Sequence, residues 1–321
     1  MVVLGIDLGG TKIIGAVFDE EGTIRSKEMY LLENREGKEV GELVLRLIDE
    51  LIGISGFSRS RIEAIGICVP GIADSKTGLV WAPNIPGWEN YPLQKEIEEH
   101  FSYPVRVNVA SDRTCYILGE RWKGAAREVS NAMFIAVGTG IGVGLLIDGR
   151  IVHGFGDVVG AAGWLALGSP YFDEYDRYGQ LEKYASGDGI ALQTRRILKE
   201  GMLFVGSSLY RLDMERVTSR DVFEAYARGD DLAEFVIGKA ILMWSLAAAN
   251  LVSLLNPEKI IWGGGVFGPA VQFIDRIYAE SCRWAQSVAI RQVSFEASQL
   301  PGGEAGLYGA GYLALLSMKN D

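Results

Sequence analysis

The chain contains the same short pattern twice: an apolar strand, a glycine-rich reversal and a second apolar strand. The first copy turns at residues 9–13 and the second at residues 138–142. Each pattern predicts a hairpin whose tip exposes backbone N–H groups, and glycine lets that backbone approach an anion closely. Taken alone, each copy is as typical of a purely structural hairpin turn as of an anion-binding tip. Because an acid, Asp7, directly precedes the first tip, the pair predicts a clamp on a polyphosphate.

Strands and helices alternate around these hairpins. Strands are predicted at 24–30, 62–69 and 105–109, and helices at 40–54, 93–101 and 113–122. The second half restarts the pattern at residue 132, interrupts it with a polar stretch at 154–187, and ends with a strand at 259–262, a glycine run at 263–265, a helix at 269–284, a strand at 292–297 and a helix at 305–317. This order predicts a duplicated α/β fold with a cleft between its halves. We place one domain at residues 1–112 and a larger one at 113–304, and expect the helix within 305–321 to pack back on the first.

The charge of the chain favours a small ligand. Its formal net charge is −10, its pI is about 4.9, and Lys and Arg form no cluster, so nucleic acid and anionic membranes are poor partners. The isolated cysteines Cys68, Cys115 and Cys282 are typical of a reduced, cytoplasmic protein. Ser and Asn side chains interrupt the longest apolar stretch, residues 240–255, and the N-terminus has no secretory pattern, which favours a soluble, unexported chain.

Several catalytic classes are excluded by motif. The chain has no P-loop, and the third glycine at 138–142 is wrongly spaced for a dinucleotide-binding fingerprint. Its two histidines, His100 and His153, are not near a plausible nucleophile, which disfavours Ser-His-Asp and zinc-hydrolase chemistry. Acidic side chains are therefore the candidates for catalysis.

Two acids and one glycine run stand at predicted strand ends. Asp7 either holds Mg²⁺ against phosphates or caps a turn. Asp112 is either a catalytic base or the N-cap of the helix that begins at Arg113. The run 263–265 either supports a base or ribose on bare backbone or is only a tight turn.

Five ordered segments resemble the ROK family of sugar kinases, repressors and uncharacterised proteins. They are residues 6–12 (IDLGGTK), 70–71 (PG), 82–88 (APNIPGW), 136–142 (AVGTGIG) and 256–266 (NPEKIIWGGGV). The opening segment alone would indicate only the wider group of actin-like, ribonuclease H-like ATPases. The five together cover nearly the whole chain in the family's order.

The resemblance implies a role for each segment. Asp112 falls where the family has its catalytic base, and Asn84 where it binds a sugar hydroxyl. The implied binding residues are, for the phosphates of ATP, Gly9, Gly10, Thr11, Lys12, Gly138, Thr139 and Gly140, and, for adenosine, Gly263, Gly264 and Gly265. The resemblance also implies a homodimer, Mg²⁺ near Asp7 and glucose as the default sugar.

The chain departs from the family pattern at the sugar. The usual Asn-Asp pair appears as Ser111 and Asp112, and the sugar-binding Glu and His appear as Ala161 and Trp164. Trp164 is either an aromatic platform for a sugar or a core residue. Glu182 is retained as a candidate hydroxyl ligand. The family's cysteine-rich zinc segment aligns with residues 173–180, which contain no cysteine, so we expect no structural zinc.

These residues predict an ATP- and Mg²⁺-dependent kinase acting on a hydroxyl of a sugar or sugar-like polyol. The alternative is a non-catalytic sugar or nucleotide sensor, or a regulator, of the same fold. Family repressors carry a DNA-binding segment before the kinase-like part, and Asp7 leaves no room for one here. Retention of both acids and both tips favours the enzyme.

Overall fold

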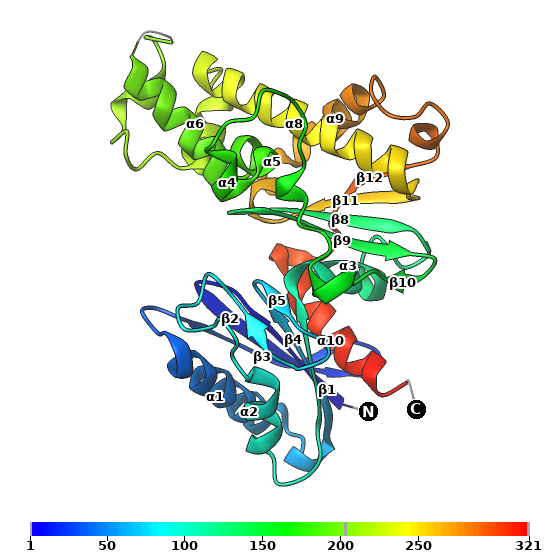
Figure 1. The fold of residues 1–321 in the computed structure, drawn as a ribbon. Helices are drawn as coiled ribbons and strands as arrows, with labels where there is room; N and C mark the ends of the chain where they lie inside the picture. The colour runs from blue at the N-terminus through cyan, green and yellow to red at the C-terminus, as the bar shows by residue number, and fades with distance from the viewer. Residues whose placement is uncertain (1, 202–203, 320–321) are drawn as a thin grey trace.

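A five-stranded sheet forms the centre of each of two lobes in the computed structural model, which describes residues 2–201 and 204–319 (Figure 1). Both sheets consist of an antiparallel three-stranded meander extended by two parallel strands. The order of the first sheet is β3-β2-β1-β4-β7: β3 Ile24–Leu31, β2 Lys12–Asp19, β1 Val2–Leu8, β4 Ile62–Val69 and β7 Arg106–Ser111. The order of the second is β10-β9-β8-β11-β12: β10 Arg150–Ile151, β9 Ile141–Ile147, β8 Ala132–Val137, β11 Lys259–Gly263 and β12 Ser294–Ala297. The predicted duplication is confirmed.

Two helices cover the outer face of the first sheet. The long helix α1 (Gly37–Ser55) has apolar residues at helical spacing and buries them against β1, β2 and β4, together with the shorter α2 (Leu93–His100). A small two-stranded sheet of β5 (Ile72–Ala73) and β6 (Val80–Trp81) follows β4. It carries the chain from the end of β4 to the loop that contains Asn84.

Helices α3 (Asp112–Lys123) and α10 (Ala305–Ser317) lie between the two sheets (Figure 1). The C-terminal helix α10 packs on the first sheet, where a Cβ added to Gly66 would lie 1.9 Å from the carbonyl oxygen of Ala310. Helix α3 packs on the second sheet through Ile117, which contacts the cluster around Phe134. This close packing joins both lobes to one shared helical layer and places the start of α3 at the cleft.

The outer side of the second lobe is helical. Its helices are α4 Tyr175–Tyr178, α5 Gln180–Ala185, α6 Gly187–Glu200, α7 Ser219–Tyr226, α8 Asp231–Leu255 and α9 Ile274–Ser281. In the described part of the chain, α8 is long and apolar enough to cross a membrane, and 56% of its apolar window is buried inside the lobe. A core helix of a soluble protein meets the same criteria, so α8 is weak evidence for a membrane span.

The predicted elements are found within about three residues of their predicted ends, apart from one predicted helix that is divided. The helix predicted at 269–284 is a 3-10 turn, Pro269–Phe273, followed by α9, and the strand predicted from residue 292 begins at Ser294. Helix α3 begins one residue early, at Asp112. Further 3-10 turns are Arg59–Arg61, Phe155–Asp157, Ala162–Trp164, Ser208–Arg211, Gly265–Phe267, Ala289–Arg291 and Pro301–Gly303.

Candidate active site

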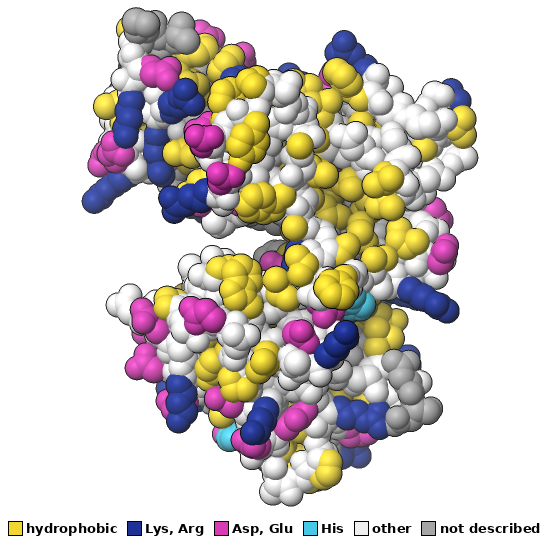
Figure 2. Space-filling view, in the orientation of Figure 1, with side chains coloured by type: hydrophobic (Ala, Val, Ile, Leu, Met, Phe, Trp, Pro, Cys, Tyr) yellow, Lys and Arg dark blue, Asp and Glu magenta, His cyan; other side chains and the backbone are white. Residues whose placement is uncertain are grey.

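The carboxyl ends of β1, β4 and β7 meet at the cleft, which Figure 2 shows as a deep notch between the lobes. Asp7 in β1 is in register with Cys68 in β4, and Cys68 is in register with Ala110 in β7. Asp112 follows two residues later. The parallel pairing therefore brings the two predicted acids to one edge of the sheet.

Asp112 is not the N-cap of α3. The cap is Ser111, whose Oγ accepts a hydrogen bond from the Thr114 N–H at 3.4 Å, so the capping alternative for Asp112 is wrong. The Asp112 Oδ1 instead accepts from the Arg113 N–H at 2.7 Å, and about a third of its side chain (33%) is exposed. Burial raises the pKa of Asp112, and the positive charge of Arg113 opposes that rise. Asp112 is therefore a partly exposed carboxylate at the cleft, with a raised pKa and no capping role.

Asp7 is half-buried below the first tip, residues 9–12. Burial raises the pKa of Asp7 to about 6, a hydrogen bond from the Cys68 thiol lowers it, and the charge of Asp112 raises it further. Gly306, at the start of α10, packs against this carboxylate. A Cβ there would lie 2.4 Å from the Asp7 Oδ2, so a side chain at this position would collide with Asp7. Two neighbouring carboxylates that repel each other form a site that a cation would stabilise.

The first tip lies beside the loop that contains Asn84. The Gly9 N–H donates to the Lys12 carbonyl at 2.9 Å, which closes the turn and leaves Gly10, Thr11 and Lys12 exposed. A Cβ on Gly10 would lie 3.3 Å from the Asn84 Cβ, so the predicted phosphate and sugar contacts adjoin.

Trp88 anchors the Asn84 loop to the first lobe. Its indole Nε1–H donates to the Gly37 carbonyl at 2.9 Å, and its ring stacks on Tyr91 with centroids 4.3 Å apart. Two backbone hydrogen bonds join Ala82 to Trp88 and Ile85 to Ala82. The buried aromatic ring thus fixes the loop that holds exposed Asn84 beside the first tip.

The second tip, residues 138–140, contacts Glu182, and the strand that leads to it contacts the glycine run 263–265. The Gly138 N–H donates to the Gly140 carbonyl at 2.9 Å, and Thr139 is exposed. Gly264 has a positive φ of 88°, and a Cβ there would lie 2.5 Å from the Val137 carbonyl oxygen, so glycine is required. This contact places the run 263–265 against the strand that leads to the second tip.

Glu182 reaches the second tip from α5. Its Oε2 accepts from the Ile141 N–H at 2.9 Å, and a Cβ on Gly140 would lie 2.8 Å from the same oxygen. Burial raises the pKa of Glu182, and the hydrogen bond from Ile141 lowers it. Sequence reasoning assigned Glu182 only to the sugar, and its contact with the tip was missed because it depends on the fold of residues 154–187.

Trp164 is 56% exposed, so the alternative of a core tryptophan is wrong. It ends the 3-10 turn Ala162–Trp164, which follows exposed Ala161. A Cβ on Gly179 would lie 2.6 Å from the Trp164 Cα, and one on Gly163 would lie 2.6 Å from the Glu182 Oε2. Trp164 therefore stands next to the segment that carries Glu182. Ser111, in contrast to Trp164, is buried, with 8% of the residue exposed. Its hydroxyl donates to the Thr114 Oγ1 at 3.2 Å.

Aromatic rings pack around residues 173–180, where the family's zinc segment aligns. Tyr175 contacts Tyr171, Phe172 and Tyr184 edge to face, and Lys183 pairs with Glu174. Over residues 2–201 and 204–319, no group of three or more His, Cys, Asp or Glu side chains could hold a metal ion.

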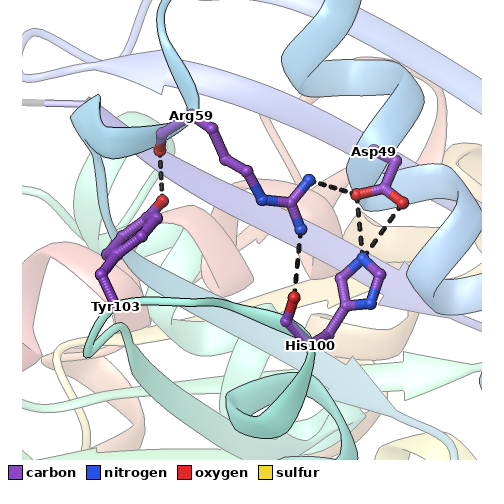
Figure 3. Close-up of polar contacts among 4 residues, drawn as sticks. All are labelled: Asp49, Arg59, His100 and Tyr103. Atoms are coloured by element: carbon purple, nitrogen blue, oxygen red, sulfur yellow. Dashed lines mark hydrogen bonds and ion pairs between the residues drawn. The ribbon is translucent and has the colours of Figure 1, made fainter.

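His100 belongs to a structural network away from the cleft (Figure 3). Its Nε2 lies 2.9 and 3.0 Å from the two Asp49 carboxylate oxygens, and Arg59 pairs with the same carboxylate. The Tyr103 hydroxyl donates to the Arg59 carbonyl. Arg59 precedes β4 and Tyr103 precedes β7, so this network lies at the amino ends of the strands, opposite the acids.

Two sheets of one topology, a glycine-rich hairpin in each and a cleft between them define the actin-like ATPase fold. The sequence profile of the ROK family matches residues 3–316, and the chain belongs to that family.

Relatives and solved structures of this family resemble the chain over nearly its full length. A glucokinase from Halalkalibacterium halodurans is 33% identical, over 97% of this chain and 94% of its own. The ROK hexokinase of Thermus thermophilus superposes with a TM-score of 0.79 at 28% identity over 100% of both chains. A ROK glucokinase from Streptomyces griseus, solved with glucose and AMPPNP, has a TM-score of 0.78 at 27% identity over 98% of this chain and 100% of its own.

Proposed function

We propose that the chain is an ATP-dependent kinase that transfers the γ-phosphoryl group to a hydroxyl of a sugar or sugar-like polyol. The observation that carries this proposal is the position of Asp112 at the cleft end of β7. Its carboxylate is partly exposed and does not cap α3. Asp7 and the first tip lie nearby, where they would bind the phosphates of ATP and their metal ion. The similarity to glucokinases supports the same activity.

Each part of the site has a role in this reaction. Asp112 accepts the hydroxyl proton as the sugar oxygen attacks the γ-phosphorus in line, and the leaving group is ADP. Backbone N–H groups of the two tips, with the Thr11 and Thr139 hydroxyls and Lys12, bind the phosphates. Gly263, Gly264 and Gly265 border the adenosine. The α3–α10 layer links both lobes, here placed at residues 1–112 and 113–304, and lobe closure excludes water.

The residues near Asp7 fit a magnesium ion. The carboxylate is half-buried, and the charge of Asp112 raises its pKa, so a divalent cation would relieve the repulsion between the two acids. Bound there, Mg²⁺ would offset phosphate charge. No such fit exists for zinc at residues 173–180, which contain no cysteine or histidine and where Tyr175 packs among neighbouring aromatic rings.

The sugar would lie among Asn84, Glu182 and Trp164, with Asp112 at the reacting hydroxyl. Glucose is the default substrate by the similarity to glucokinases. Ala161 and Trp164 replace two hydroxyl-binding side chains of a typical member, and the exposed indole adds an apolar face. A substrate with fewer hydroxyls on that side would fit better than glucose.

We place the protein in the cytoplasm as a homodimer that binds neither nucleic acid nor membranes. Exposed apolar side chains on α8 and after α9, Leu242, Leu254 and Trp284, support self-association of the second lobe. Light scattering after size exclusion tests the dimer: a monomeric mass at micromolar concentration contradicts it.

The activity is tested by a coupled assay of ADP release with magnesium across hexoses, amino sugars, ketoses and cyclitols. We expect Asp112→Asn to lower kcat about a hundredfold or more with little change in ATP affinity, because a general base contributes on the order of 10²–10⁴. A variant within threefold of wild type would show that Asp112 is no base. Sugar binding by calorimetry without turnover of any panel member would favour the sensor.

A further inference from the structure

Arg113 directly follows the proposed base, and its guanidinium bridges the two lobes. Its Nη2 donates to the Gly71 carbonyl at 3.3 Å, in the turn after β4 of the first lobe. Its Nη1 donates to the Val158 carbonyl at 3.4 Å, in the loop after β10 of the second lobe. Only 13% of the Arg113 side chain is exposed.

The aliphatic part of Arg113 passes over two glycines of the second lobe. A Cβ on Gly142 would lie 2.8 Å from the Arg113 Cγ, and one on Gly160 would lie 3.5 Å from its Cδ. Gly142 is in β9, just after the second tip, and Gly160 begins the segment that carries Ala161 and Trp164. The side chain is thus held against both the phosphate side and the sugar side of the cleft.

The same residue contacts Asp112 twice. The Arg113 backbone N–H donates to the Asp112 Oδ1 at 2.7 Å, and the Arg113 Nε lies 3.9 Å from that oxygen. A planar guanidinium with fixed donors can hold two carbonyls and face a carboxylate at once, which a lysine ammonium cannot do in one geometry. Any rotation of the first turn of α3 would break this set of contacts.

We propose that Arg113 is a positioning residue that fixes the Asp112 carboxylate toward the cleft by tying the first turn of α3 to Gly71 and Val158. The inference rests on the proposed function, since it needs Asp112 as the base. Arg113 acts through Asp112 and not on the sugar, because its donors are directed to backbone carbonyls of both lobes.

The test uses Arg113→Met, which keeps the unbranched stem and removes the donors. Because a misplacement of about 1 Å can cost on the order of 10²-fold in rate, we expect kcat to fall about 10- to 100-fold while KM for ATP and for the best sugar stays within threefold. Arg113→Lys should recover part of the loss, since an ammonium reaches one carbonyl. Arg121→Met is the matched control: it lies on the same helix and donates to the Gly149 carbonyl, away from the base, and should keep kcat within twofold.

The variant is then repeated in the Asp112→Asn background. If Arg113 acts by orienting the base, Arg113→Met lowers the residual kcat there by less than twofold, whereas general damage to the cleft would lower it as much as in the wild type. An equal loss in both backgrounds, an unchanged kcat, or a raised sugar KM at unchanged kcat each overturns the proposal. If Arg113→Met does not fold by circular dichroism, Arg113→Lys decides instead: unchanged kcat overturns the positioning role. Wild-type activity of Asp112→Asn would overturn the role of Asp112 as the base, whereas absence of turnover of every sugar in the panel would overturn the proposed function itself.

Discussion

Asp7→Asn should stabilise the protein while removing its activity. The folded-state pKa of Asp7 is about 6, against an ordinary value of 3.8, because burial and the Asp112 charge disfavour the ionised carboxylate. The difference of about 2 corresponds to roughly 3 kcal/mol at 1.36 kcal/mol per unit of pKa. The folded state therefore binds more protons than the unfolded state between pH 4 and 6, and stability falls as pH rises through that range. Asn has nearly the same shape and carries no charge.

The assay is urea unfolding of both proteins with EDTA and without nucleotide, from pH 4 to pH 8. We expect the variant to gain up to about 3 kcal/mol at pH 7–8, and the gain to vanish near pH 4. Asp74→Asn is the control, because backbone hydrogen bonds from Thr77 lower the pKa of Asp74, so its removal should give no gain at neutral pH. A gain independent of pH, or no gain at pH 7.5, would refute the reasoning.

Two further outcomes follow from the sugar side of the cleft. Elemental analysis should find no stoichiometric zinc, and chelators should leave Tm unchanged, because aromatic packing fills residues 173–180; one zinc per chain would contradict this. Glucose should be a mediocre substrate, and Trp164→Ala should weaken binding of the best sugar more than binding of ATP, since the exposed indole belongs to the proposed sugar site and not to the phosphate tips. That reading of Ala161 and Trp164 is wrong if glucose leads the panel with kcat/KM above roughly 10⁴ M⁻¹s⁻¹.

Local patterns alone predicted the elements and the turns. The tips at 9–12 and 138–140 could be identified because glycine, threonine and alternating apolar residues specify a hairpin within a few positions. The acids Asp7 and Asp112 could be assigned to one edge because the carboxyl ends of parallel strands meet there. These inferences need only neighbours in sequence and the pairing order of the strands.

Contacts between distant segments were decided by the tertiary structure. That Glu182 reaches the Ile141 N–H and that Trp164 is exposed each depend on how the chain packs over long separations. The cap of α3 is a local contact, but whether Ser111 or Asp112 forms it depends on the residue at which β7 ends. Gly306 gave no sequence signal at all, although a side chain there would collide with Asp7. Arg113 had one signal, its place after the base, but its two carbonyl partners are about 40 residues away on either side, in different lobes. Side-chain packing across lobes has no period in the sequence, so it can be seen only once the lobes are assembled.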